Sequence, residues 1–509
     1  MLLLCIGTSA MAQRVMETLD RGLVAVKTNG GVFLSWRIDG TEYYDTEYNI
    51  YRDGVLVNES PLMVSNYTDA AGTLNSTYAV SAVVRGTEQT ACEAVGVWRQ
   101  PYLSIPMQKV YSRRGTDITS EYSLNDATAA DLDGDGQMEL IVKRIYNHEG
   151  LFDVANDSAF VHFEAYKLDG TWLWTIDCGP NMISSSHVET NINAFDWDLD
   201  GKAELIMRAT DGTIVTNAKG ETYTVGDMKA NYRNQISHSS NMTYATAGAE
   251  FLLYMEGLTA KQYNKRAFPL PRLESGESSI EAAWGDGYGH RANKFFFGAP
   301  YLDGCKPSIF LARGIYTRHR MVAYDVNPET HELTERWRWN DVGGAWWGQG
   351  YHNYGIADVD WDGRDEIVYG SMVIDDNGKG LSTTGLGHGD AQHCSDLDPY
   401  RKGQEIFACN ENAKGYNYRD ATTSKLYFFN DIGRDCGRAM AGNFTDSYLG
   451  SQMVAVGSGL LSSVVAKSVS DGYSNITQNF RIYWDGDLCS ESLDGNNRAK
   501  KPTTDSYHL

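Results

Sequence analysis

The sequence is short of cysteine, of proline and of long apolar runs, and these shortages exclude several classes of protein. Its 8 cysteines are scattered along 509 residues and include no C-x-x-C pair, so neither a disulfide framework nor a zinc knuckle is indicated. No segment approaches the ~20 consecutive apolar residues that a membrane-spanning helix needs. We therefore expect no membrane span.

Positive charge is also scarce. Lys and Arg number 44 against 66 Asp and Glu, which gives a formal net charge of -22. A nucleic-acid partner would require the opposite balance, so none is expected. Tyr (31), Trp (12) and Gly (51) are abundant, which is typical of short aromatic-rich strands separated by glycine turns. We expect a monomeric, all-β protein.

The first residues resemble the end of a secretory signal peptide. Residues 10–12 (AMA) form an A-x-A cleavage site behind a short apolar run, and we assign 1–12 to a signal-peptide remnant. The charged region that normally opens such a signal is missing, so the true start codon is expected upstream. The protein is therefore predicted to be exported, to the periplasm or the extracellular space.

Residues 13–100 differ from the rest of the chain. The segments 32–37, 48–54 and 77–84 alternate apolar and polar residues as strands do, and 53–54 (DG) is a hairpin signal. The order of a Trp strand and two Tyr strands resembles a fibronectin type III-like β-sandwich. We expect this sandwich to pack against the rest of the protein and to carry no catalytic residue.

Three acidic stretches share the template D-x-D-x-D-G-x-x-E. Alternating carboxylates with a glycine at the turn form a cage of oxygen ligands, which calcium prefers. The final Glu comes too early for an EF-hand and runs directly into strand-like residues, so we expect calcium turns between strands. Acidic surface turns without metal are the alternative. The predicted calcium ligands are Asp131, Asp133, Asp135 and Glu139; Asp196, Asp198, Asp200 and Glu204; and Asp358, Asp360, Asp362 and Glu366.

The spacing of these turns predicts the architecture of residues 101–509. They start at 131, 196 and 358, with a degenerate copy at 396, and the long interval from 196 to 358 fits about three repeat units. Imperfect all-β repeats of ~40–60 residues favour a calcium-binding β-propeller with long insertions. A solenoid of β-turns is the alternative.

Several segments together resemble polysaccharide lyase family eleven, the rhamnogalacturonan lyases. The resemblance implies an eight-bladed, calcium-binding propeller with an N-terminal sandwich. It also implies cleavage of the rhamnose–galacturonate backbone of rhamnogalacturonan I, an acidic plant cell-wall polysaccharide (pectin), by β-elimination. The segments are 21–24 (RGLV), 48–54 (YNIYRDG), 130–136 (ADLDGDG), 284–291 (WGDGYGHR), 301–304 (YLDG), 313–318 (RGIYTR), 350–352 (GYH), 387–393 (GHGDAQH) and 480–487 (FRIYWDGD).

The implied reaction needs two kinds of group. A base removes the weakly acidic proton beside the uronic acid carboxylate, and positive charge on that carboxylate stabilises the enolate-like intermediate. The resemblance implies a catalytic calcium ion held by His352, His388, Asp390 and Glu411. From these residue types alone, zinc or manganese would be the expected ion, and hydrogen bonding of the histidines to loop backbone is the alternative.

Five further residues are candidates for substrate contact. Asn125 and Asp126 match an Asn–Asp pair of the family's cleft, although a simple turn explains them equally well. Arg291, Arg313 and Arg318 could grip a carboxylate with two parallel hydrogen bonds. Arginines that bridge neighbouring blades through buried ion pairs are the alternative.

The chain departs from the family pattern in two places. Residues 143–147 (KRIYN) replace a Trp–acidic pair that commonly follows the lysine. The family also continues well past the segment at 480–487, so we expect a C-terminally truncated, incomplete propeller and assign no general base. Two other functions stay open: a non-catalytic, calcium-stabilised propeller that binds glycan or protein, and a glycoside hydrolase, which would need a defined pair of carboxylic acids.

Overall fold

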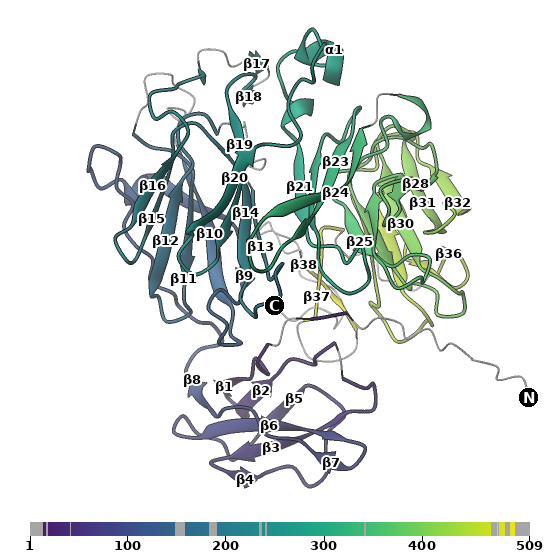
Figure 1. Cartoon of the computed structure of the whole chain (residues 1–509). Helices are drawn as coiled ribbons and strands as arrows, with labels where there is room; N and C mark the ends of the chain where they lie inside the picture. Colours follow the sequence, from purple (N-terminus) through teal and green to yellow (C-terminus); the bar gives the residue numbers. More distant parts are fainter. Residues whose placement is uncertain are drawn as a thin grey trace, which may run out of the picture.

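A computed structural model describes residues 14–16, 19–40, 42–147, 158–182, 191–233, 237–239, 242–340, 343–469, 476, 478–483 and 489–493. The predicted signal-peptide remnant lies outside these residues. Figure 1 shows a small all-β unit, formed by the first eight strands, below a larger body of sheets. In the described part, no helix is long and apolar enough to span a membrane.

The small unit is a β-sandwich. Its strands follow the order β4-β3-β6-β8-β1-β2-β5, with β7 beside β6. One core contains side chains from β1 and β2 as well as β3 and β6, among them Leu34, Tyr48 and Tyr78, so the sheet folds over on itself. The strands are β1 (Val24–Thr28), β2 (Gly31–Ser35), β3 (Glu47–Arg52), β4 (Val55–Leu56), β5 (Asn66–Asp69), β6 (Thr77–Val84), β7 (Thr87–Glu88) and β8 (Val95–Trp98).

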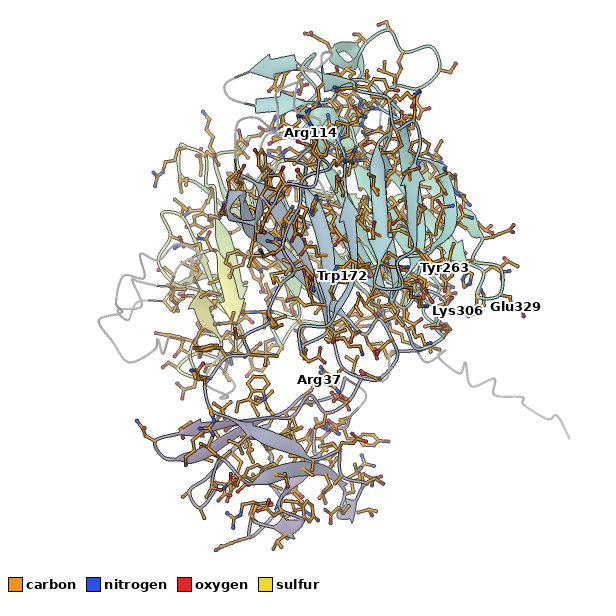
Figure 2. The ribbon with its side chains drawn as sticks, turned by 90° about the vertical axis from the view of Figure 1, so that its left-hand side faces the viewer. Arg37, Arg114, Trp172, Tyr263, Lys306 and Glu329 are labelled. Atoms are coloured by element: carbon orange, nitrogen blue, oxygen red, sulfur yellow. The ribbon has the colours of Figure 1, made fainter. Side chains whose placement is uncertain are left out.

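The predicted hairpin of the sandwich is present. Asp53 and Gly54 both have positive φ, 51° and 78°, and Arg52 pairs with Val55 across the turn. This is the geometry that the tight hairpin turn requires. Arg37 lies where the sandwich meets the larger body (Figure 2), and its Nη1 donates to the backbone oxygen of Asp20 at 2.7 Å.

The larger body is a β-propeller whose sheets follow one another along the chain. The first sheet is unusual because β15 and β16 extend it after the chain has already begun the second. Its strands are β9 (Tyr122–Ala130), β10 (Glu139–Tyr146), β11 (His162–Tyr166), β12 (Trp172–Asp177), β15 (Thr213–Asn217) and β16 (Thr222–Val225), preceded by the 3-10 turn Thr119–Glu121.

The second and third sheets each have four strands. The second contains β13 (Ile192–Phe195), β14 (Glu204–Thr210), β19 (Glu250–Glu256) and β20 (Gln262–Ala267), and the hairpin β17 (Ser237–Ser239) and β18 (Met242–Tyr244) stands apart from it. The third contains β21 (Phe295–Gly298), β22 (Ile309–Arg313), β23 (Arg320–Val326) and β24 (Leu333–Asn340). The helix α1 (Ile280–Trp284) and the 3-10 turn Arg291–Asn293 lie between these two sheets in the sequence.

Four more sheets follow. The fourth contains β25 (Gly355–Ala357), β26 (Glu366–Tyr369), β27 (Met372–Ile374) and β28 (Gly380–Thr383), after the 3-10 turn Gly344–Trp346. The fifth contains β29 (Gln392–Ser395), β30 (Glu405–Asn410), β31 (Gly415–Asp420) and β32 (Leu426–Asp431). The sixth contains β33 (Ala439–Gly442), β34 (Gln452–Ala455), β35 (Leu461–Ser462) and β36 (Lys467–Ser468), and the two-stranded seventh contains β37 (Phe480–Ile482) and β38 (Glu491–Leu493).

Apolar side chains between neighbouring sheets hold the propeller together. Separate buried clusters join the first sheet to the second and each later sheet to the next, as far as the sixth. The first strands of neighbouring sheets also contact one another, for example β25 and β29, which places them nearest the axis. The prediction of an all-β propeller with an N-terminal sandwich is confirmed.

One detail of the predicted spacing is wrong. The interval between the second and third acidic turns spans two repeat units, not three, because the turns belong to the second and fourth sheets. The extra length lies in insertions: the strands β15 to β18 and the segment that carries α1. The acidic turns themselves connect the first and second strands of a sheet, as predicted.

Candidate active site

The four residues predicted to hold a catalytic ion lie on two neighbouring sheets. His352 precedes β25, His388 and Asp390 precede β29, and Glu411 lies in the turn between β30 and β31. The backbone ties these segments together, because the N–H of Glu411 donates to the carbonyl of His388 at 3.0 Å. Tyr351 and Gly389 also form a parallel bridge. Because His352 precedes β25 and the third acidic turn follows it, the two lie at opposite ends of that strand.

His388 directs a free nitrogen at Glu411. The His388 side chain is 2% exposed. Its Nδ1 lies 2.6 Å from the carbonyl oxygen of Gly350, a partner that only accepts, so Nδ1 carries the proton. Its Nε2 is buried, has no hydrogen-bond partner in the part of the chain that the structure describes, and lies 3.5 Å from Oε2 of Glu411. The lone pair of Nε2 is therefore available to a ligand.

His352 completes the group. Its Nε2 lies 3.1 Å from the hydroxyl of Tyr316 and 3.7 Å from Oδ1 of Asp390, and its ring centroid is 5.1 Å from that of His388. The four predicted residues thus form two close pairs. Among these described residues, no three bring ligand atoms within 4.8 Å of one another, so the two pairs lie side by side without forming one tight cluster.

The electrostatics of the group favour a cation. The side chain of His352 is 38% exposed, so only its partial burial, together with the neighbouring His388, lowers its pKa below the ordinary value. Burial also lowers the pKa of His388, so both rings are neutral electron-pair donors at neutral pH. Burial raises the pKa of Asp390 to about 6, and Asp435 adds to this, while Arg438 opposes it. Two neutral imidazoles and two carboxylates fit a divalent ion.

A pocket of about 690 Å³ opens beside this group. Its lining includes Arg291, Tyr316, Trp347, His388 and Glu411. The volume lies in the usual range for ligand sites, and the lining combines an aromatic surface, a positive charge and two of the four predicted metal ligands, His388 and Glu411. Sequence reasoning missed Tyr316 and Arg438. They are identified as site residues only because the fold brings them close to the predicted ligands His352 and Asp390.

The three predicted arginines have different environments. Arg291 lines the pocket, and its side chain is 35% exposed. Its Nε lies 3.8 Å from Oδ2 of Asp286. Arg313 is completely buried and its Nη1 donates to Oε2 of Glu250 at 2.8 Å. Because Glu250 belongs to the second sheet and Arg313 to the third, this pair bridges two blades, which is the alternative role considered above.

Arg318 and the Asn–Asp pair lie outside this pocket. Arg318 is nearly buried, pairs with Glu277 and donates to Oδ1 of Asn340 at 3.0 Å. It lines a second hollow, about 300 Å³, that shares Trp347 with the first pocket. Asn125 and Asp126 are exposed on β9, where Oδ2 of Asp126 lies 3.5 Å from the buried ammonium of Lys143.

Each acidic turn gathers carboxylates around one position. Ligand oxygens lie within 4.8 Å of one another for Asp131, Asp133 and Glu139, for all four predicted residues of the second turn, and for Asp358, Asp360 and Glu366. Asp135 and Asp362 stand outside these groups. In every turn the final Glu accepts the N–H of the residue after the first Asp, as Glu366 does from Val359 at 2.8 Å.

The final glutamates show that these turns suit a cation. Burial, together with the neighbouring carboxylates, raises the pKa of Glu139 to about 7, of Glu204 to about 9 and of Glu366 to about 8. Crowding of buried carboxylates produces such values, and in the first turn it does so even with the ammonium of Lys167 3.8 Å from Glu139. In the second turn, His331 from the β23–β24 turn approaches Asp198 at 3.3 Å and stacks on Tyr263, whose position is labelled in Figure 2.

Comparison with known proteins identifies the family. Residues 102–508 match the model of the C-terminal domain of rhamnogalacturonan lyase family 11, and residues 14–98 match that of the β-sheet domain of rhamnogalacturonan I lyases. The chain belongs to rhamnogalacturonan lyase family 11. This confirms the family resemblance and the prediction of an enzyme of the rhamnogalacturonan lyase class.

Relatives within family 11 cover nearly all of the chain. The rhamnogalacturonan endolyase YesW of Bacillus subtilis is 43% identical over 513 residues, which is 97% of this chain and 78% of the relative. The exolyase YesX of the same organism is 41% identical over 95% of this chain and 78% of the relative. The crystal structure of YesW matches with a TM-score of 0.81 at 42% identity, over 95% of this chain and 80% of that one.

Proposed function

We propose that this chain is exported and cleaves the rhamnose–galacturonate backbone of rhamnogalacturonan I by calcium-dependent β-elimination. Membership of the lyase family supports the reaction class, and the cluster of His352, His388, Asp390 and Glu411 supports a metal ion at the reacting centre. We further propose that residues 101–509 form the catalytic domain and that the sandwich, 13–100, supports it.

The single observation that carries a metal ion at this site is the free nitrogen of His388. A buried ring nitrogen without a partner is costly, and this one faces a carboxylate oxygen at 3.5 Å. Its other nitrogen is fixed by the carbonyl of Gly350, the arrangement by which proteins orient histidine ligands. A bound divalent cation would satisfy the nitrogen and would draw negative charge from the substrate carboxylate.

The remaining residues of the pocket bind and orient the substrate. The guanidinium of Arg291 is accessible in the lining and can donate two hydrogen bonds to a carboxylate. Arg438 is exposed, and its charge acts on both Asp390 and His352, so it adds positive potential where the intermediate would be negative. Trp347 offers an apolar face to a sugar ring.

The reaction is tested by digestion in water enriched in oxygen-18. Elimination forms a carbon–carbon double bond and incorporates no label, whereas hydrolysis places the label at the new chain end. We expect unlabelled, unsaturated fragments by mass spectrometry. The Glu411→Gln variant should lose most of this activity, while Glu329→Gln, the same change in the exposed turn between β23 and β24 (Figure 2), should keep it. Labelled products would refute the proposal.

A further inference from the structure

Three arginines meet one glutamate in the buried joint between the second and third sheets. Oε1 of Glu250, the first residue of β19, lies 3.0 Å from Nη1 of Arg208. The same oxygen lies 3.2 Å from Nη2 of Arg272, an ion pair that is not aligned as a hydrogen bond. Its Oε2 accepts from Nη1 of Arg313 at 2.8 Å. All four side chains are at most 8% exposed, and we call these four residues the arginine cluster.

The charges of the arginine cluster do not balance. Within the described part of the chain, its three guanidinium groups pair with no carboxylate other than that of Glu250. Burial would raise the pKa of Glu250, yet Arg272, Arg313 and Arg208 lower it to about 2. Burial lowers the pKa of Arg313 to about 9, although Glu250 opposes this, and Arg272 adds to it. Positive charge is therefore in excess at a buried place.

Several N–H groups of the arginine cluster also lack an acceptor. Nε of Arg313 donates to the carbonyl oxygen of Ala292 at 2.6 Å, and Nη1 of Arg272 donates to that of Gly248 at 2.9 Å. Nη2 of Arg313, Nη2 and Nε of Arg272 and Nε of Arg208 are buried and have no hydrogen-bond partner among the described residues. Unpaired donors and unbalanced charge are both costly away from water. The geometry therefore calls for an acceptor that carries negative charge.

A neighbouring pair of arginines shows the balanced case. Arg318 pairs with Glu277, and Arg320 lies 3.0 Å from Glu277 and 3.5 Å from Glu274. Two guanidinium groups thus face two carboxylates, although the side chain of Arg320 is only 1% exposed. The chain itself offsets these buried arginines, whereas in the arginine cluster it does not.

The surroundings of the arginine cluster limit what can bind there. The ring of Phe295 faces the guanidinium of Arg208 at 4.4 Å and that of Arg313 at 4.9 Å, which offsets only part of the positive charge. Because the side chains are so little exposed, a sugar acid of the substrate does not reach them. A small inorganic anion can be enclosed as the sheets pack together.

We propose that the arginine cluster binds one small monovalent anion with the chemistry of chloride, at the unpaired N–H groups of Arg272 and Arg313. The anion accepts hydrogen bonds that the chain leaves unmade and reduces the excess of positive charge. Its role is structural, because it holds the second sheet to the third, and it does not depend on the lyase reaction.

Crystallography with bromide in place of chloride tests the site directly. Bromide has the same charge as chloride and a similar size, and its anomalous scattering identifies it. Crystals of the calcium-loaded wild-type chain grown in bromide should show an anomalous peak bounded by Arg208, Arg272 and Arg313. The absence of a peak at this place, or density that appears only with sulfate, would overturn the proposal.

Thermal unfolding measures whether the anion stabilises the protein. Chloride replaces methanesulfonate, which is too bulky for an enclosed site, at constant ionic strength and constant calcium. We expect the unfolding temperature to rise to a plateau, by about 2–4 °C. Arg272→Met should lose this response, whereas the matched control Arg320→Met, which also removes a buried arginine, should keep it. Equal chloride responses of the two variants would contradict the site, and the bromide experiment decides the question if Arg272→Met does not fold.

Discussion

The stability of the calcium-free protein should fall as the pH rises, and Glu366 gives the clearest case. Burial and the carboxylates of the third acidic turn raise its pKa to about 8, far above the ordinary value of ~4.3. In this pH interval the folded state binds a proton that the unfolded state has released. Its contribution to stability is therefore present at low pH and is lost as the pH rises towards the folded-state pKa.

The size of this effect follows from the linkage between proton binding and folding. Each pH unit between the two pKa values removes ~1.4 kcal/mol of stability, so a change from pH ~5 to ~7 removes on the order of 3 kcal/mol through Glu366. Glu139 and Glu204, whose pKa values are also raised, act with the same sign. Calcium at ~100 times its dissociation constant would restore ~2.7 kcal/mol per site.

The assay compares thermal unfolding of wild type and Glu366→Gln in a chelator across this pH range. The variant cannot release the proton, so its stability relative to the wild type should increase with pH. With saturating calcium the order should reverse, because the variant has lost a charged ligand. The control is Glu329→Gln, on an exposed turn. A difference between Glu366→Gln and the wild type that does not change with pH would refute the reasoning.

Three further substitutions separate catalytic, binding and structural roles. His388→Ala should lower kcat by at least ~100-fold, the usual scale for losing an electrostatic contact to the transition state, with little change in unfolding temperature; an active variant would contradict its role. Arg291→Ala should raise KM by ~10–100-fold, since a hydrogen bond to a charged group contributes ~1.5–3 kcal/mol, and Arg291→Lys should restore part of the lost affinity. Steady-state rates over a range of substrate concentrations measure both values of KM. An unchanged KM for Arg291→Ala would exclude a contact between Arg291 and the substrate. Arg313→Met should lower the free energy of unfolding by ~3–5 kcal/mol, because it removes one buried ion-pair partner of Glu250, and it should leave KM unchanged. Thermal unfolding and the same rate measurements test this. A raised KM would show that Arg313 contacts the substrate.

The acidic turns and the sandwich could be predicted because their signals are local. The template D-x-D-x-D-G-x-x-E fixes a turn between two strands, and alternation of apolar residues fixes strands such as β6 (Thr77–Val84). The extension of the first sheet by β15 and β16 could not be predicted in this way. β15 pairs with β12, and β16 pairs with β15, after the chain has already begun the second sheet. Such long-range pairing leaves no periodic pattern in the sequence.

The same limit applies to the site. The family motifs identified His352, His388, Asp390 and Glu411, and the structure places them as two neighbouring pairs. They did not distinguish Arg291, which lines the pocket, from Arg313, which is buried against Glu250. Whether an arginine binds substrate or bridges two blades depends on its partners in the folded structure. The partner of Arg313, Glu250, lies 63 residues away from it in the sequence, so the sequence does not reveal the pair. Tyr316 and Arg438 were missed for the same reason.

The most direct test of the central claim is the ultraviolet absorbance of rhamnogalacturonan I incubated with this protein, with a chelator and then with calcium restored. Elimination creates a double bond conjugated to the carboxylate, which absorbs, whereas hydrolysis does not. We expect a rising signal that the chelator abolishes and calcium restores. A signal that persists in a chelator under which the protein has lost its bound metal would contradict a catalytic calcium ion at His388.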